Sequence, residues 1–368
     1  MKRNLPEVLI LFNTPTVSIS ENSCDESDIG VLSEVEAVST ALDELGVPFR
    51  AVGVKRLQDV VFVLPRAPER IVFNLVEGFD KRPEEMNYVP ALCTAFSKSC
   101  TGGDTPSLIL SLDKWQTKAV LQAAGLPVPE GVSVPVGNKI PTSRLPKPPL
   151  IVKPACTDAS EGIHADTSIF QKVGPKLHAA VDAIHKRFGH AALIEQFFGT
   201  REINVSVIDR RGHPEVVAIA EIDFSAFEPD RPNVVDYAAK WRNDTFVFHN
   251  TPRMLPAPVS QHQAAEIERV ALGAWHAVGC RDYARVDLRM DARGRLAILE
   301  INTNPDIAPD AGFAAALDYA QIPYREFVAS TVQNAFKRLN GKPCESENVR
   351  KYKSAKVRES LEIHSWGE

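Results

Sequence analysis

The sequence predicts an α/β (α+β) protein with a parallel N-terminal sheet, a small central module and a C-terminal part built on a mixed sheet. Three observations predict this class. Strand and helix patterns alternate over the first hundred residues, as in parallel α/β domains. A capped helix and a buried strand then form a separate short unit. The last part is rich in strands and closes with two that have the spacing of a hairpin.

The composition is that of an ordinary globular protein and excludes several classes. The 368 residues are 44% hydrophobic and 24% charged, with a net charge of −5, so the basic footprint of a nucleic-acid-binding protein is missing. The six cysteines form no C-x-x-C pair, which fits a reducing compartment. No segment is long enough to span a bilayer. We therefore expect a cytoplasmic protein with no nucleic-acid or membrane partner.

Residues 1–107 are predicted to form the N-terminal α/β substrate domain. Their basic start is followed by a short apolar run that indicates a first strand rather than a signal peptide. A polar loop at 13–32 is long enough to be functional rather than a simple connection. The expected elements are strands at 8–12 and 70–79, and helices at 32–46 and 86–96.

Residues 108–190 are predicted to form a central module that acts as a lid. Its first helix should begin at Ser111 or Asp113 and end at Gly125, because a capping residue and a glycine followed by a proline mark the two ends. After it we expect a proline-rich loop at 134–149, a strand at 150–154, a polar loop at 155–166, and a helix at 168–188 interrupted near Gly174 and Pro175.

Residues 191–340 are predicted to form the C-terminal catalytic domain, and residues 341–368 a charged, solvated tail. The expected elements are strands at 192–198, 201–210 and 214–222, a long loop to residue 258, a helix at 261–278, and paired strands at 283–291 and 295–304.

The paired strands place unexpected charge on a buried surface. A two-residue turn at Arg293-Gly294 would set Asp287 opposite Glu300 and Arg285 opposite Asn302. On the other face, Val286, Leu288 and Met290 would meet Ile301, Leu299 and Ala297. Facing carboxylates repel unless a cation lies between them, and an all-oxygen set suits Mg²⁺. The alternative is that Arg285 and Arg289 neutralise both acids without a metal; the hairpin alone does not decide between them.

Five motifs, in order, extend the pattern beyond the hairpin. They are "LDKWQTKAVLQAAGLPVP", "LIVKPACTDASEGI", "ALIEQFFGTREINVSVI", "DYAAKW" and "ARVDLRMD…LEINTNP". In this order and spacing the sequence resembles the ATP-grasp ligases, and within them the D-alanine–D-alanine ligase group, over about residues 8 to 329. The resemblance implies an ATP-grasp fold and an enzyme that joins a carboxylate to an amine.

The resemblance assigns a role to each matched residue. Lys114 and Lys153 contact the ATP phosphates, for which the compact charge of lysine is well suited. Ser160 lies in the loop that covers the phosphates, although this loop has fewer glycines than usual and adds Glu161. Adenine is read by Glu195 and the backbone at Phe198, and the ribose is held by Glu202.

The remaining roles concern the transferred phosphate. Lys240 reaches the nucleotide or the phosphate, and Arg285 stabilises the tetrahedral intermediate or binds the acceptor's carboxylate. The metal ligands are Asp287, Glu300 and Asn302. The cofactors implied are ATP and one or two Mg²⁺ ions, with Mn²⁺ as a substitute, and the partners are small-molecule substrates. Dimers are common among relatives, so a homodimer is an open expectation.

The sequence departs from the D-alanine ligases directly after the metal strand. Those ligases continue with Asn-x-x-Pro-Gly and a serine-rich turn that receives the acceptor's carboxylate. Here Asp306 replaces the glycine, Asp310 follows, and Ala311 has no hydroxyl. This predicts a substrate pair other than two D-alanines, with a cationic, amine-bearing or neutral acceptor. Three alternatives stay open: that Asp310 merely caps the next helix, that the protein is an authentic D-alanine–D-alanine ligase, and that it is a non-catalytic ATP-binding homologue.

Overall fold

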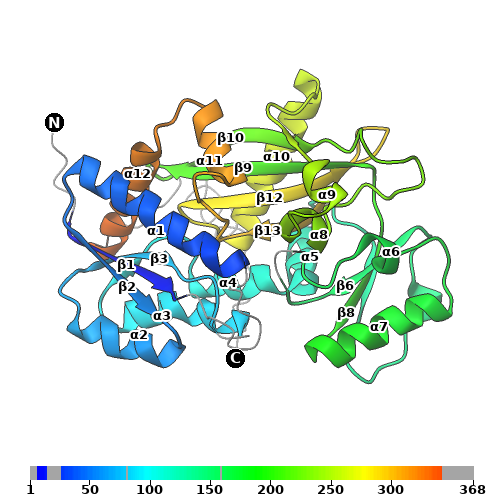
Figure 1. Ribbon diagram of the computed structural model, residues 1–368, viewed down its shortest axis with the longest axis horizontal. Coiled ribbons are helices and arrows are strands. Elements are labelled where there is room, and N and C mark those ends of the chain that lie inside the picture. Colours follow the sequence, from blue (N-terminus) through cyan, green and yellow to red (C-terminus); the bar gives the residue numbers. More distant parts are fainter. Residues whose placement is uncertain (1–5, 15–25, 80–81, 158–159, 342–368) are drawn as a thin grey trace, which may run out of the picture.

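Three sheets form the framework of the protein. The structure is a computed structural model that describes residues 6–14, 26–79, 82–157 and 160–341. Figure 1 shows the N-terminal sheet at the left, the five-stranded C-terminal sheet across the top and the central four-stranded sheet, with helix α7, at the lower right. The expected α/β (α+β) class is confirmed, since a parallel sheet and antiparallel sheets occur in one chain.

The N-terminal sheet is parallel, with strand order β2-β1-β3-β4. The expected strands and helices are present. Strand β2 was not expected: it is an edge strand, and only one of its six side chains is buried. Residues 15–25 of the predicted functional loop lie outside the described residues. The elements are β1 Val8–Asn13, α1 Glu26–Leu45, β2 Phe49–Val54, α2 Leu57–Val63, β3 Ile71–Leu75, α3 Val89–Ala95 and β4 Ser99–Cys100.

The central sheet is antiparallel, with strand order β5-β8-β6-β7. The expected helix at 168–188 is wrong in its first part, which is a short strand and a turn. Pro175 takes the first helical position instead, because proline disfavours helical geometry in the residue before it. The elements are α4 Thr105–Leu112, α5 Lys114–Ala123, β5 Gly131–Val134, β6 Leu150–Pro154, α6 Ala165–Ser168, β7 Ile169–Phe170, α7 Pro175–Phe188 and β8 Ala192–Gln196.

The C-terminal sheet has the order β11-β10-β9-β12-β13, and all its pairs are antiparallel rather than mixed. The expected long loop to residue 258 contains two short helices and a short strand. The elements are β9 Arg201–Arg210, β10 His213–Ile222, α8 Tyr237–Trp241, α9 Phe246–His249, β11 Arg253–Met254, α10 Gln261–Val278, β12 Tyr283–Met290, β13 Leu296–Asn302, α11 Gly312–Tyr319 and α12 Tyr324–Leu339.

The last helix returns to the first sheet. Helix α12 packs against α1, and its buried Phe327 and Val332 belong to the same apolar cluster as Val8 and Ile10 of β1. A second cluster joins α10 to one face of the C-terminal sheet. The division at 107/108, 190/191 and 340/341 stays a prediction. Within the described residues, no helix is both long and apolar enough to cross a membrane.

The closing hairpin pairs as predicted at its polar end and differs near its turn. Asp287 lies opposite Glu300 and Arg285 opposite Asn302. The predicted two-residue turn is wrong: residues 291–295 form the connection, in which the Asp291 carboxylate accepts the N–H groups of Arg293 and Arg295.

The register then shifts by one residue, so that Leu288 faces Ile298, not Leu299 as expected, and Met290 faces Leu296 rather than Ala297. Leu299 is thus the extra residue of a β-bulge.

Candidate functional site

Helix α5 places two lysines on one buried face. Asp113 begins the helix by accepting the N–H groups of Trp115 and Gln116. Lys114 and Lys118 follow four residues apart, and they are only 5% and 4% exposed. The Lys114 ammonium donates to the carbonyl of Thr157 and lies 3.5 Å from Glu300 Oε2. The helix therefore directs positive charge toward both the polar loop and strand β13.

The central sheet supplies a third lysine and a buried acid. Lys153 on β6 and Glu195 on β8 are diagonal neighbours on one sheet face, since Ile151 pairs with Glu195 and Lys153 with Leu193. Lys153 Nζ lies 2.9 Å from Glu195 Oε2, and Lys118 Nζ lies 3.1 Å from Oε1. One carboxylate that is 1% exposed therefore lies between two ammonium groups.

Burial and charge act in opposite directions on this group. Burial favours the neutral form of Glu195, but Lys118 and Lys153 outweigh it, and the pKa of Glu195 lies below its usual value. Burial lowers the pKa of Lys118 to about 8, with Glu195 opposing the shift. The cluster is therefore ionised at neutral pH.

Each acid of the hairpin has a cation beside it. Arg285 reaches both oxygens of Asp287, with Nε–Oδ1 at 2.8 Å and Nη2–Oδ2 at 2.9 Å, and Asn204 also donates to Oδ1 at 2.8 Å. Burial raises the pKa of Glu300, but Lys114, Lys240 and other cations lower it to about 2. Glu300 is therefore held as a carboxylate.

Of the two arginines considered for these acids, Arg285 pairs with Asp287, whereas Arg289 pairs with Glu202 and Lys114 is the cation beside Glu300. Among the described residues, no group of three His, Cys, Asp or Glu side chains gathers as a metal centre. Even so, Asp287 and Glu300 face each other across the strands and Asn302 stands on the same face, one pair further on. Two carboxylates and an amide oxygen are donors that fit Mg²⁺.

Arg289 organises the opposite end of the site. It lies directly across from Glu202 in the β9–β12 pairing, with Nη1 3.3 Å from Oε2. Its Nε donates to the carbonyl of Phe198 at 2.7 Å and its Nη2 to that of Gly199 at 3.1 Å. Burial raises the pKa of Glu202, although Arg289 opposes this. The turn between β8 and β9, expected to read adenosine, is thus fixed by a buried arginine.

Two loops from different parts of the chain are bonded to each other over the site. Ser160 donates its hydroxyl to the carbonyl of Val235 at 2.9 Å. Tyr237 N–H donates to the carbonyl of Ile163 at 3.1 Å, and Ala165 N–H to the carboxylate of Asp236 at 3.1 Å. Lys240 stands one helical turn further on, in α8. The polar loop and the segment that carries Lys240 therefore form one unit.

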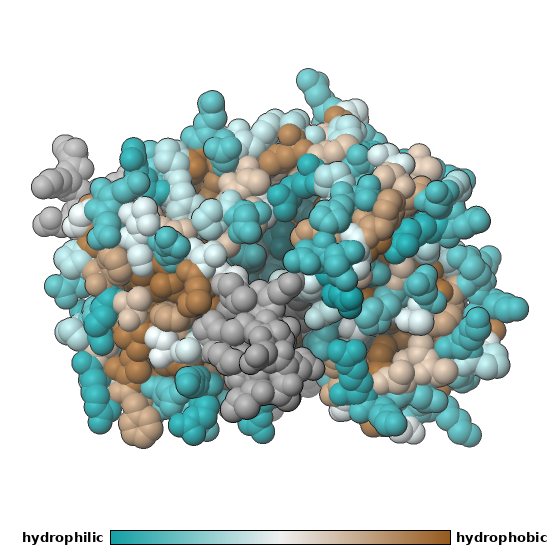
Figure 2. Space-filling model, viewed as in Figure 1, coloured by the Kyte–Doolittle hydropathy of each residue, from teal (hydrophilic) through white to brown (hydrophobic). Residues whose placement is uncertain are grey.

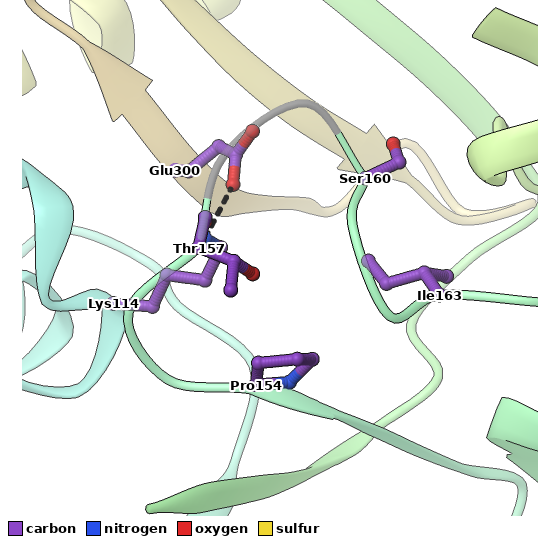
Figure 3. Close-up of a pocket in the computed structure, with 6 residues that line it drawn as sticks. All are labelled: Lys114, Pro154, Thr157, Ser160, Ile163 and Glu300. Carbon is purple, nitrogen blue, oxygen red and sulfur yellow. Dashed lines mark hydrogen bonds and ion pairs between the residues drawn. The ribbon is translucent and has the colours of Figure 1, made fainter. Parts of the chain in front are cut away.

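These elements enclose a pocket. Figure 3 shows Lys114 and Glu300 on one side and Ser160 and Ile163 across from them; Pro154 and Thr157 complete the lining. In Figure 2 hydrophilic side chains surround a recess near the centre of the molecule.

The structure brings most of the predicted residues together. Lys114, Lys153, Glu195 and Glu300 belong to one charge network, Lys240 adds positive charge to it, and Glu202 and Phe198 lie at its far end. The predicted helix cap at Asp310 is wrong, because Ala311 is the N-cap residue of α11 and no side chain caps it. The sequence reasoning missed Lys118, Asn204 and the contacts of Arg289. The four-residue spacing from Lys114 could have revealed Lys118.

The sequence matches a known protein family and two of the relatives described below. The family described as "D-ala D-ala ligase C-terminus" matches residues 121–333, more than half of the chain. An uncharacterised protein, y4sG, of Sinorhizobium fredii is 28% identical over 74% of this chain and 76% of its own length. A D-alanine–D-alanine ligase of Actinobacillus pleuropneumoniae serotype 5b is 27% identical over 82% of this chain and 92% of its own.

Solved structures share the fold. The D-alanine–D-alanine ligase of Bacillus anthracis, solved in complex with ATP, superimposes with a TM-score of 0.72 at 16% sequence identity. The alignment covers 92% of this chain and all of that one. At this identity the match establishes the fold alone.

Proposed function

Because the chain belongs to the D-alanine–D-alanine ligase family of ATP-grasp carboxylate–amine ligases, we propose that it joins a carboxylate to an amine other than two D-alanines. The observation that carries the proposal is that Lys114 and Glu300 meet at one pocket, with Lys153 in the same charge network, beside facing hairpin acids. Positive charge for phosphates and oxygen donors for a cation are what phosphoryl transfer from ATP requires.

The proposed chemistry is carboxylate activation. The γ-phosphoryl group of ATP passes to the substrate carboxylate, which gives an acyl phosphate and ADP. The amine attacks the acyl carbon, Arg285 stabilises the oxyanion, and phosphate leaves as the amide forms. The bonded loops at 160–165 and 235–237 exclude water, which would otherwise hydrolyse the acyl phosphate.

Each remaining residue has a place in this scheme. Glu195, the Phe198 backbone and Glu202 hold adenosine, while Ser160 and Lys240 contact the phosphates. Asp287, Glu300 and Asn302 would hold one or two Mg²⁺ ions, which supply Lewis-acid charge neutralisation when bound. A cytoplasmic location and a homodimer stay predictions.

The acceptor is proposed to be cationic, amine-bearing or neutral. Asp306 and Asp310 are exposed beside the start of α11, and Ala311 caps that helix without a hydroxyl. Arg285 has both of its bonds on Asp287, which reduces what it can offer to an acceptor carboxylate. A cation is also close to this helix start, since Arg253 Nη2 lies 2.8 Å from where a Cβ of Gly312 would be. Because a cation there favours an acceptor carboxylate, the test includes acceptors with free and with amidated carboxyl groups.

The deciding experiment measures ADP release with Mg²⁺-ATP and pairs of D- and L-amino acids, free and amidated, followed by mass spectrometry of the products. We expect EDTA-sensitive turnover that is fastest with a pair other than two D-alanines. Fastest turnover with D-alanine alone, giving D-alanyl-D-alanine, would overturn the substrate proposal. Binding of ATP with no turnover on any pair would support the non-catalytic alternative instead.

A further inference from the structure

Lys118 is a buried lysine that has no role in the proposed reaction. Its ammonium group lies 3.1 Å from Glu195 Oε1 and also donates to the carbonyl oxygen of Leu299. Burying an ammonium group is costly unless its partners repay the lost hydration. Its partners come from strand β8 of the central sheet and strand β13 of the C-terminal sheet, so one side chain bridges both walls of the nucleotide site.

The charges around Glu195 show what this bridge does. Lys153 is expected to serve the phosphates, yet its Nζ lies 2.9 Å from Glu195 Oε2. If Lys153 were the only cation beside Glu195, the two would form a neutral pair with no charge to spare. Lys118 on the other oxygen leaves one net positive charge on the trio, so Glu195 does not fully neutralise Lys153.

The bond to Leu299 involves the irregular part of the metal strand. Leu299 is the bulged residue of β13 and stands between Ile298 and Glu300. A bulge leaves a residue outside the regular ladder and redirects neighbouring side chains. The carbonyl freed in this way accepts from Lys118, directly before the residue whose carboxylate faces Asp287.

We propose that Lys118 is a positioning residue: it neutralises Glu195 so that Lys153 keeps its charge for the ATP phosphates, and it fixes the bulge that aims Glu300. The inference rests on the proposed ATP site. It goes beyond that site by assigning a function to a residue that the proposed mechanism does not use.

The test compares nucleotides with and without phosphates. Titration calorimetry on the full chain should show that Lys118→Met weakens ATP binding by about tenfold or more, the size expected for a lost charge-assisted contact. Adenosine, which has no phosphate, should bind within about threefold of the wild type. Equal weakening of both ligands would mean that Lys118 serves the adenine side or the fold, and would overturn the inference.

A double variant separates charge balance from packing. In Lys118→Met/Glu195→Gln the competing carboxylate is gone, so Lys153 regains its free charge. Because Glu195 is also proposed to hold adenosine, the measure is the ratio of ATP affinity to adenosine affinity, which should recover relative to Lys118→Met alone. No recovery of this ratio would overturn the inference. The same pair keeps the test informative if Lys118→Met folds poorly, because removing both charges leaves no unpaired buried acid.

Lys98→Met is the matched control. Lys98 is also a buried lysine, and its Nζ donates to the carbonyls of Ala67 and Glu69 at 2.6 and 2.5 Å, remote from the nucleotide site. It should lose stability without a change in ATP affinity. Failure of the wild type to bind ATP would reject the proposed function itself; wild-type ATP affinity in a folded Lys118→Met would reject only the role of Lys118.

Discussion

The carboxylates of Asp287 and Glu300 are the side chains on which the proposed reaction depends most. They face each other across two strands, and each has a cation beside it. This arrangement keeps two negative oxygen donors a short distance apart in a partly buried place. The neighbouring cations offset the repulsion between the two acids, and the set presents the donors that a metal requires.

Conservative substitution of either acid should remove activity without unfolding the protein. Asp287→Asn and Glu300→Gln keep size and hydrogen bonding but lose the charge that holds Mg²⁺, so ADP formation should fall below detection. Circular dichroism and urea unfolding provide the folding control. Near-normal turnover in either variant would show that the metal ligands lie elsewhere.

Glu34 gives a pH-dependent prediction about stability. It is 2% exposed, accepts the Ile307 N–H at 2.7 Å, and burial followed by repulsion from Glu77 and Asp306 raises its pKa well above the ordinary value. The folded protein therefore holds this proton at pH values where the unfolded chain has lost it. Stability must then fall as pH rises through the folded pKa.

The substitution Glu34→Gln removes this proton equilibrium and keeps the bond to Ile307. The unfolding free energy of the variant, relative to that of the wild type, should increase as pH rises from about 5 to about 8, measured by urea titration. Glu36→Gln, an exposed position on the same helix, should show no such trend. An advantage for Glu34→Gln that stays constant with pH would contradict the assignment.

Among the elements, the turn between β8 and β9 leaves no space for a side chain at Gly199. Gly199 has a φ of +63°, and a Cβ there would lie 2.5 Å from the carbonyl oxygen of Met290 on β12. Arg289 also fixes the turn by donating to the carbonyls of Phe198 and Gly199. The turn that is expected to hold adenosine is thus set by backbone packing.

Gly199→Ala should cost more than an ordinary glycine replacement in left-handed geometry. Gly279 has a φ of +77° with open space around its Cβ position, so Gly279→Ala measures the conformational penalty alone, about 1–2 kcal/mol. Gly199→Ala adds a clash with backbone and should lose a further 1–3 kcal/mol, roughly the cost of overpacking. Urea unfolding would measure both losses of stability. Equal losses would show that the turn shifts enough to avoid the clash.

Some of the contacts of these strands follow from the sequence and others do not. The pairing of Asp287 with Glu300 was predictable, because alternation along two strands places them on one face. The bulge at Leu299 was not, since alternation does not mark the extra residue, and the lysine that donates to its carbonyl is 181 residues away in the chain. Glu195 was recognised by its motif, but its partners come from β6 and α5, and only the folded chain shows that one acid serves two lysines.

At the scale of the whole molecule, a buried ion pair between Arg338 and Asp282 connects elements that are far apart in the chain. Arg338 of α12 donates to Asp282 at 2.8 and 2.7 Å and to the carbonyl of Cys100, and Asp282 also accepts the Gly102 N–H. The Asp282 side chain is fully buried. One carboxylate thus links the last helix, the N-terminal sheet and the start of β12.

Removing Arg338 should destabilise the molecule strongly. Arg338→Met leaves Asp282 charged, buried and short of its partner, a change that costs about 3–5 kcal/mol in comparable pairs. Arg325→Met is the control on the same helix, because its pairing with Glu44 at 3.5 Å is half exposed and should be worth less than about 1 kcal/mol. Chemical denaturation would compare them, and a loss of similar size in both would contradict the role given to Asp282.

The hydrogen bonds between residues 160–165 and residues 235–237 have a consequence for how ligands bind. A ligand that orders one of these loops also orders the other, so the second ligand meets a loop whose entropy has already been lost. Nucleotide and acceptor should therefore bind cooperatively. By thermodynamic reciprocity, the factor by which ATP raises the affinity for the acceptor must equal the factor by which the acceptor raises the affinity for ATP.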